Sequence, residues 1–123
     1  MDNRNEMLAV DIYQWCKKKG LWGDNCIYYD GIALASWPDW HGVAGKRIAE
    51  DLYKYDSKSP LDYIRYANPD TITMSFEGPL NHVLNGYVSG WVKLENEFSK
   101  LFEKHGLYFE MGYSWSLAAD ELP

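Results

Sequence analysis

Apolar and polar residues alternate strictly in two stretches of the chain, Thr71–Glu77 and Leu107–Leu117. Successive side chains of a β-strand point to opposite faces of the sheet, so strict alternation predicts strands that are buried on one side. Such strands favour an antiparallel sheet with helices on its apolar face and a wetter opposite face. If the two stretches are neighbours, hydroxyl and carboxylate side chains dominate the wetter face.

Helical spacing of apolar residues predicts longer helices at Glu6–Lys19, Val43–Tyr55 and Ser89–Lys104. A short helix is expected at Pro60–Ala67, because Ser59 can cap it and proline is favoured at the first helical position. Leu80–Leu84 has room for one or two further helical turns.

A hairpin is expected where Asp30-Gly31 separates two short apolar runs, since both residues tolerate the positive φ of a tight turn. Together these patterns predict an α+β fold. We expect residues 1–123 to form a single compact domain, with one antiparallel sheet of about four strands and three to four helices packed on one face.

Charge is distributed unevenly along the chain, whose formal net charge is −6. The stretches 66–92 and 105–123 contain five acidic residues and no lysine or arginine. Such a surface repels phosphates, which disfavours direct nucleic-acid binding, and it attracts a basic protein partner. A net charge of this size also serves solubility alone, so both interpretations stay open.

Sequence motifs for phosphate loops, nucleophile elbows and metal-binding helices are missing, so neither a cofactor nor a metal is expected. Cys16 and Cys26 are expected to be small buried apolar residues. Asp39 and His41 lie two residues apart between tryptophans, and with Glu77 they offer the parts of an acid–base site. A packed or surface histidine is the alternative.

Aromatic residues are abundant, with six Trp, ten Tyr and four Phe. Trp and Tyr dominate the energetics of protein interfaces, and they also complete the cores of small domains. Several lie beside acidic residues, as in Trp37-Pro38-Asp39-Trp40, which suits a basic protein partner. The candidate partner-binding residues are Trp37, Asp39, Trp40, Asp56, Asp62, Asp70, Glu77 and Glu110.

These features favour a non-enzymatic acidic protein that inhibits a basic partner, such as a nuclease or another nucleic-acid-binding protein, by occupying its nucleic-acid-binding or catalytic surface. In size and composition the chain resembles phage anti-defence (anti-CRISPR-like) inhibitors and the immunity proteins of toxins, although no motif carries the likeness. The alternatives are a small enzyme built on His41, Asp39 and Glu77, or a homo-oligomeric structural subunit. No long apolar run is present, so we expect a cytoplasmic protein without a membrane partner.

Overall fold

The computed structural model describes residues 3–123 and contains nine β-strands, three α-helices and one 3₁₀ turn within that range. The strands are β1 (Asn25–Tyr29), β2 (Ile32–Ala35), β3 (Asp39–Trp40), β4 (Val43–Ala44), β5 (Lys46–Ala49), β6 (Leu52–Tyr55), β7 (Thr73–Phe76), β8 (Leu107–Met111) and β9 (Ser116–Glu121). The helices are α1 (Arg4–Lys19), α2 (Pro79–Leu84) and α3 (Trp91–Glu103), and the 3₁₀ turn is η1 (Pro60–Asp62).

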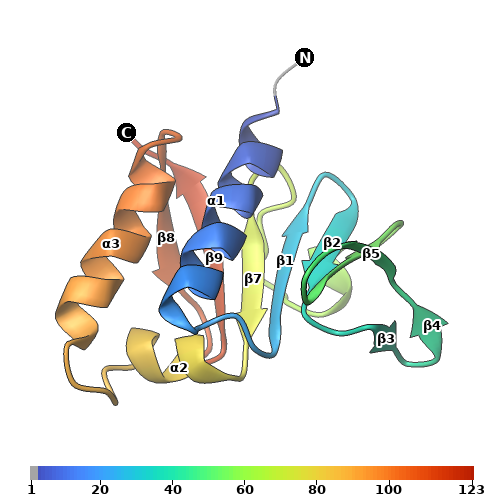
Figure 1. Ribbon diagram of the computed structural model, residues 1–123. Coiled ribbons are helices and arrows are strands. Elements are labelled where there is room, and N and C mark those ends of the chain that lie inside the picture. The colour runs from blue at the N-terminus through green and yellow to red at the C-terminus, as the bar shows by residue number, and fades with distance from the viewer. Residues whose placement is uncertain (1–2) are drawn as a thin grey trace.

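Seven strands form one antiparallel sheet in the order β5-β6-β2-β1-β7-β9-β8, and β3 pairs with β4 in a separate hairpin (Figure 1). The α+β class is therefore confirmed, but the expectation of about four strands is wrong. The extra strands come from two hairpins, β5–β6 and β8–β9, which were expected to be a helix and a single strand respectively.

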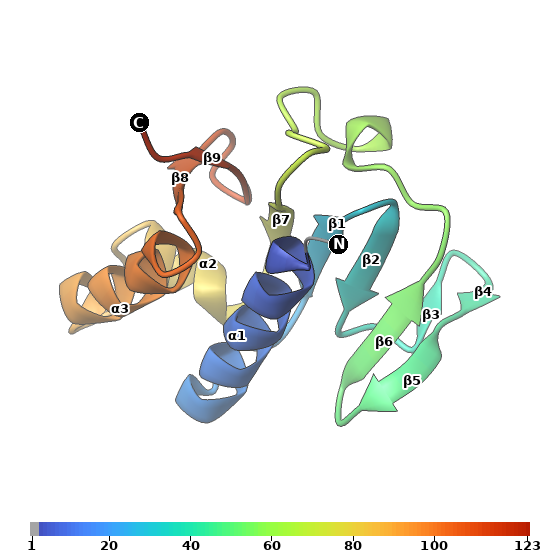
Figure 2. The ribbon, with the colours of Figure 1, turned by 90° about the horizontal axis from the view of Figure 1, so that it is seen from above.

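The three helices pack on one face of the sheet, as expected (Figures 1 and 2). Alternate strand residues, among them Ile27, Met74 and Leu117, point into this layer. Phe98 of α3 is fully buried there and packs edge-on against Phe102, with ring centroids 5.1 Å apart. Phe98 and Phe102 of the predicted apolar stripe are therefore buried, whereas Trp91, at the start of the helix, is 37% exposed.

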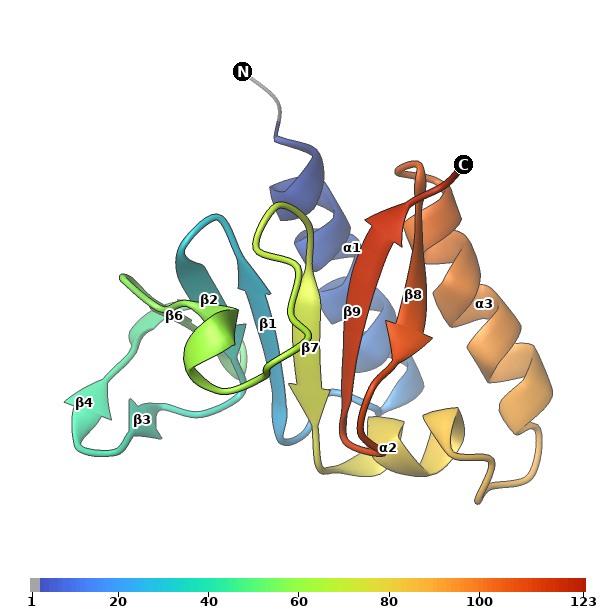
Figure 3. The ribbon, with the colours of Figure 1, turned by 180° about the vertical axis from the view of Figure 1, so that it is seen from behind.

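The opposite face of the sheet carries a second cluster of buried residues, so it is not simply the wet face that alternation suggested. Cys26 and Tyr28 of β1 and Tyr55 of β6 point to this side. The β3–β4 hairpin and the segment 57–70 contribute Trp40 and Ile64 to the same cluster. Figure 3 shows this side, with η1 and its flanking loop in front of the sheet. We call this cluster the aromatic layer.

The helix expected over Val43–Tyr55 does not form, because this segment contains β4 and the β5–β6 hairpin. Asp51 takes a φ of 55° in the turn between the two strands. Leu52 packs into the helix layer, whereas Tyr53 and Tyr55 belong to the aromatic layer. Side chains are thus apolar on both faces of β6, which removes the alternation that would have identified a strand.

The strand expected over Leu107–Leu117 is interrupted. Residues 112–115 form a turn in which the Gly112 N–H donates to the Ser116 carbonyl and the Ser116 N–H to the Tyr113 carbonyl. The chain then returns as β9, which lies between β8 and β7. The two alternating stretches are therefore adjacent through β9 and not through β8.

Of the shorter elements predicted, the Asp30-Gly31 turn and the helical turns near Leu80 are confirmed, and the helix over Pro60–Ala67 is not. Asp30 and Gly31 have φ values of 50° and 79° in the β1–β2 turn, and α2 covers the expected turns near Leu80. Ser59 does accept the capping hydrogen bond from the Leu61 N–H, but the helix expected over Pro60–Ala67 is only the single turn η1.

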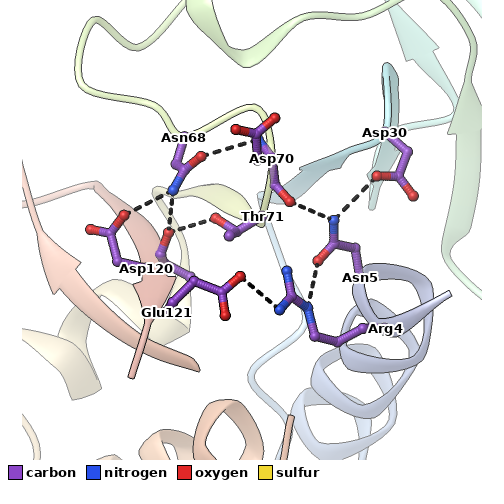
Figure 4. A network of polar contacts seen from close by, with 9 residues as sticks. Arg4, Asn5, Asp30, Asn68, Asp70, Thr71, Asp120 and Glu121 are labelled. Carbon is purple, nitrogen blue, oxygen red and sulfur yellow. Dashed lines mark hydrogen bonds and ion pairs between the residues drawn. The ribbon is translucent and has the colours of Figure 1, made fainter. Parts of the chain in front are cut away.

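A polar network ties the amino end of α1 to the loop before β7 (Figure 4). The Asn5 amide donates to Asp30 Oδ1 at 3.2 Å and to the Asp70 carbonyl at 3.1 Å. The Asn68 amide donates to Asp120 Oδ1 at 2.8 Å. These contacts fix the loop that leads into the central strand β7.

Within residues 3–123, no helix has the length and apolar character needed to span a bilayer.

Candidate functional site

A pocket of about 460 Å³ opens in the aromatic layer. Five aromatic residues line it, namely Tyr28, Trp37, Trp40, Tyr63 and Trp115. The polar lining residues are His41, Asp62, Ser75 and Glu77. Apolar walls with a few convergent polar groups are typical of ligand-binding sites.

The aromatic walls meet at steep angles around Trp40. Trp37 lies 5.2 Å from Trp40 at an interplanar angle of 72°, and Tyr28 lies 6.1 Å from it at 63°. Trp40 itself is 7% exposed, whereas Tyr63 is 45% exposed. Trp40 therefore forms the interior of the cluster, and Tyr63 forms part of its rim.

The β3–β4 hairpin and the residue pair before it place Trp37, Trp40 and His41 at the pocket. The two central residues of the hairpin, His41 and Gly42, have φ values of 51° and 85°, as a tight hairpin turn with matching twist requires. The Gly42 N–H donates to Asp39 Oδ1 at 2.9 Å. The Tyr55 hydroxyl donates to the Trp37 carbonyl at 2.7 Å, which anchors the hairpin to β6.

The opposite wall comes from the segment after η1. Ile64 is 1% exposed and holds this segment on the sheet, and the Tyr63 ring stacks on Tyr28 with centroids 5.9 Å apart. In the sheet below, the pairing of β1 with β7 sets Cys26 opposite Ser75. The pocket thus forms between two loop segments and the central strands.

The carboxylates of the lining, Asp62 and Glu77, are exposed, and no ion pair involves either of them within residues 3–123. No lysine or arginine is among the described residues that line the pocket. Lys58 approaches Trp40 from elsewhere: its ammonium lies 4.5 Å from the Trp40 ring centre, and it lines a separate hollow beside Tyr55 and Asp56. The pocket therefore combines aromatic walls with two carboxylates that have no ion-pair partner within residues 3–123.

The buried hydroxyl and thiol beneath the pocket stay protonated at neutral pH. Burial raises the pKa of Tyr28 well above its ordinary value, and its neighbour Cys26 raises it further. Burial likewise raises the pKa of the Cys26 thiol to about 12. A thiolate nucleophile is the reactive form of cysteine, so Cys26 supplies none here.

The acid–base residues are only partly assembled. His41 and Glu77 line the same pocket, whereas Asp39 lies outside the lining and accepts the Gly42 N–H. Within the described part of the chain, no hydrogen bond joins the His41 side chain to Asp39 or to Glu77. A general base oriented by a carboxylate therefore does not form in this geometry.

Of the eight predicted partner-binding residues, Trp37, Trp40, Asp62 and Glu77 meet at the pocket, and Asp39 supports the hairpin beside it. The other three lie elsewhere. Asp56 is 3.9 Å from Lys54 on the far side of Tyr55, Asp70 belongs to the network of Figure 4, and Glu110 lies on β8.

Three of the lining aromatics, Tyr28, Tyr63 and Trp115, are not among the partner-binding residues predicted from the sequence. Trp115 falls within the predicted strand Leu107–Leu117, but β8 ends at Met111. A turn signal was present at Gly112-Tyr113-Ser114, and it separates Trp115 from β8.

A second hollow, of about 520 Å³, lies where α2, α3 and the end of α1 meet. Leu21, Pro79, Val83 and Leu94 line it, and His82 is its one titratable lining residue within the described chain. It offers apolar burial without charged groups to orient a ligand, so the aromatic pocket is the stronger candidate site.

Among residues 3–123, no group of His, Cys, Asp and Glu side chains is placed to hold a metal ion. Comparisons with protein-family models, with curated proteins and with solved structures find no match for this chain.

Proposed function

We propose that this chain is a binding protein that inhibits a basic partner protein by occupying its nucleic-acid-binding or catalytic surface. The observation that carries the proposal is the aromatic pocket, in which Asp62 and Glu77 stand beside five aromatic rings without a compensating basic residue in the lining. Aromatic anchors beside exposed acids suit the basic side chains that such a surface presents.

The lysine-free segments support the same proposal. Glu77 and Trp115 of the lining lie in the stretches 66–92 and 105–123, which contain no lysine or arginine. Negative potential on these stretches steers a basic protein toward the pocket and repels a phosphate backbone. A partner protein is therefore favoured over a nucleic acid as the bound molecule.

The test starts with affinity capture from host lysate at low and moderate salt, followed by purification of the captured protein. The purified partner should lose affinity for nucleic acid, or catalytic activity, when this chain is added. A variant with both Asp62→Asn and Glu77→Gln should inhibit at least about tenfold less, because exposed charges at the rim of an interface set the rate of encounter. A variant with both Glu95→Gln and Glu103→Gln removes the same two charges on α3, behind the sheet, and should inhibit as the unaltered chain does.

Two results would overturn the proposal. One is simultaneous binding of nucleic acid or substrate and this chain to the purified partner, with full partner activity. The other is equal inhibition by the doubly neutralised variant and by the unaltered chain at every salt concentration.

A small acid–base enzyme is the second candidate, because His41 and Glu77 do share the pocket. The two candidates differ in what they require of His41. His41→Gln should leave inhibition of the partner within about twofold if the chain acts by occupying a surface. Loss of inhibition with binding retained would favour the enzyme.

A further inference from the structure

We infer that the aromatic pocket takes the guanidinium group of an arginine side chain, presented by the basic partner. The inference rests on the proposed function for the origin of the arginine, but its chemistry rests on the pocket alone. It follows from the arrangement of the rings, from the two free carboxylates and from the cation that the aromatic layer already binds.

The rings that line the pocket lie at several angles and do not form one flat platform. Trp37 and Tyr28 stand at 72° and 63° to Trp40, while Tyr63 is tilted by 36° to Trp40 and stacks on Tyr28 at 27°. These rings pack against one another, with centroids 5.2–6.1 Å apart, so a ligand meets their exposed faces and edges where the cluster borders the pocket. Aromatic faces attract cations, and tryptophan attracts them most strongly.

Two carboxylates complete the recognition of a positive charge. Asp62 and Glu77 come from the η1 segment and from the end of β7, so they approach the pocket from two different elements. Both are exposed and therefore accessible to a ligand. A guanidinium carries a planar fork of donors that can pair with a carboxylate while its face stacks on an aromatic ring.

The protein's own Lys58 already places one cation on this layer. Its ammonium lies 4.5 Å from the Trp40 ring centre, within the distance at which the attraction is significant. Lys58 lines the neighbouring hollow and is not part of the pocket lining. The pocket thus remains open to a second cation on the Asp62 and Glu77 side.

Arginine suits the pocket better than lysine. A volume of about 460 Å³ accommodates an arginine side chain, whose planar guanidinium can stack on an aromatic face while its donors pair with a carboxylate, and an ammonium cannot do both. Lysine ammonium groups are also more strongly hydrated, so their transfer onto aromatic walls costs more.

The experiment follows the tryptophan indole N–H resonances by NMR while short peptides are added. The probes are Ac-Gly-Arg-Gly-NH₂, the citrulline peptide, which has the same shape without the charge, and the lysine and trimethyllysine peptides. Resonances of Trp37, Trp40 and Trp115 should move saturably with the arginine peptide. Those of Trp15 and Trp22, which donate to Glu97 and to the Asp51 carbonyl on the helix side, serve as internal controls and should not move.

The arginine peptide should bind at least about tenfold more tightly than the citrulline peptide, since charge is the recognised property. Glu77→Gln should weaken arginine binding by about fivefold or more, and the matched Glu103→Gln should leave it within about twofold. Trp37→Phe should weaken binding while Trp91→Phe on α3 should not, and circular dichroism checks that each variant is folded.

Equal binding of the arginine and citrulline peptides would overturn the inference, as would tighter binding of lysine or trimethyllysine, or no shift at about 10 mM peptide. Failure here can be separated from failure of the proposed function. If the peptides do not bind but the purified partner is still inhibited, the arginine inference is wrong and the inhibitor proposal stands. If the arginine peptide binds and the partner keeps full activity, the inhibitor proposal is wrong and the arginine inference stands.

Discussion

The ammonium of Lys58 lies 4.5 Å from the centre of the Trp40 ring, so a cation is part of the folded aromatic layer. Lys58→Met keeps the alkyl stem and removes the charge. We expect this change to lower the free energy of unfolding by about 0.5–1 kcal/mol, measured by urea denaturation. Lys100→Met, at an exposed position on α3, is the control, and an equal loss in both variants would contradict the interaction.

Trp37 and Trp40 should respond differently to truncation, because only Trp40 is buried. Trp40→Ala should lower the free energy of unfolding by about 3–5 kcal/mol, as expected for a large buried aromatic. Trp37→Ala should cost less stability and mainly weaken ligand binding. Thermal melts and peptide titrations on both variants test this difference, and a larger loss of stability for Trp37→Ala would contradict it.

Phe98 is the central aromatic of the helix layer, with no exposed surface and with Trp15, Phe102 and Phe109 around it. Phe98→Ala should reduce the free energy of unfolding by about 3–5 kcal/mol in chemical denaturation. A loss below about 1 kcal/mol would mean that the cavity is refilled by neighbouring side chains.

Stability should depend on pH through Glu97. The Trp15 indole donates to its Oε1 at 3.1 Å and Lys19 lies 3.3 Å from the same atom, and these contacts hold the pKa of Glu97 below its ordinary value of 4.5. A carboxyl group whose pKa is lower in the folded state than in the unfolded state stabilises the protein at any pH above its unfolded-state pKa. This stabilisation is lost as the pH falls through the pKa of the folded state.

Glu97→Gln removes that titration. The stability difference between the unaltered chain and this variant should therefore be largest near neutral pH and shrink below about pH 4. Urea denaturation at several pH values measures it. A difference that stays constant across this range would show that Glu97 acts through packing alone.

The two cysteines should be unreactive in the folded protein. Both thiols are buried, and burial raises the pKa of each to about 12. An aromatic disulfide reagent at about pH 8 should therefore label native protein slowly and both thiols rapidly in denaturant. Ser89→Cys adds an exposed thiol as a positive control, and rapid labelling of Cys26 in the native state would show that the aromatic layer opens.

Elements with one apolar face were predictable from sequence. The α3 stripe around Phe98 and the Asp30-Gly31 turn follow from local periodicity and turn chemistry, and both are confirmed. The β5–β6 hairpin was missed for a physical reason. Leu52 and Tyr55 point to opposite apolar layers, so alternation disappears, and with Ile48 they imitate helical spacing.

The site was predictable only where its residues are close in sequence. Trp37, Trp40 and His41 occur together, and their hairpin places all three at the pocket. Tyr28 and Glu77 join them because β1 pairs with β7, which no local pattern specifies. Long-range pairing therefore limits what sequence alone can show of this pocket.

The pocket exists only when distant segments of the chain are paired, so a ligand bound in it should lengthen the lifetime of the folded protein. Trp37, Tyr63, Glu77 and Trp115 reach the pocket from four separated segments, so no isolated hairpin or helix contains the complete binding site. A ligand that recognises only the completed arrangement adds to the free energy of unfolding as its concentration rises above its Kd. Proteolysis of transiently opened molecules slows accordingly. Under the proposed function, the chain would thus persist longest in cells that contain its target and be cleared where the target is missing.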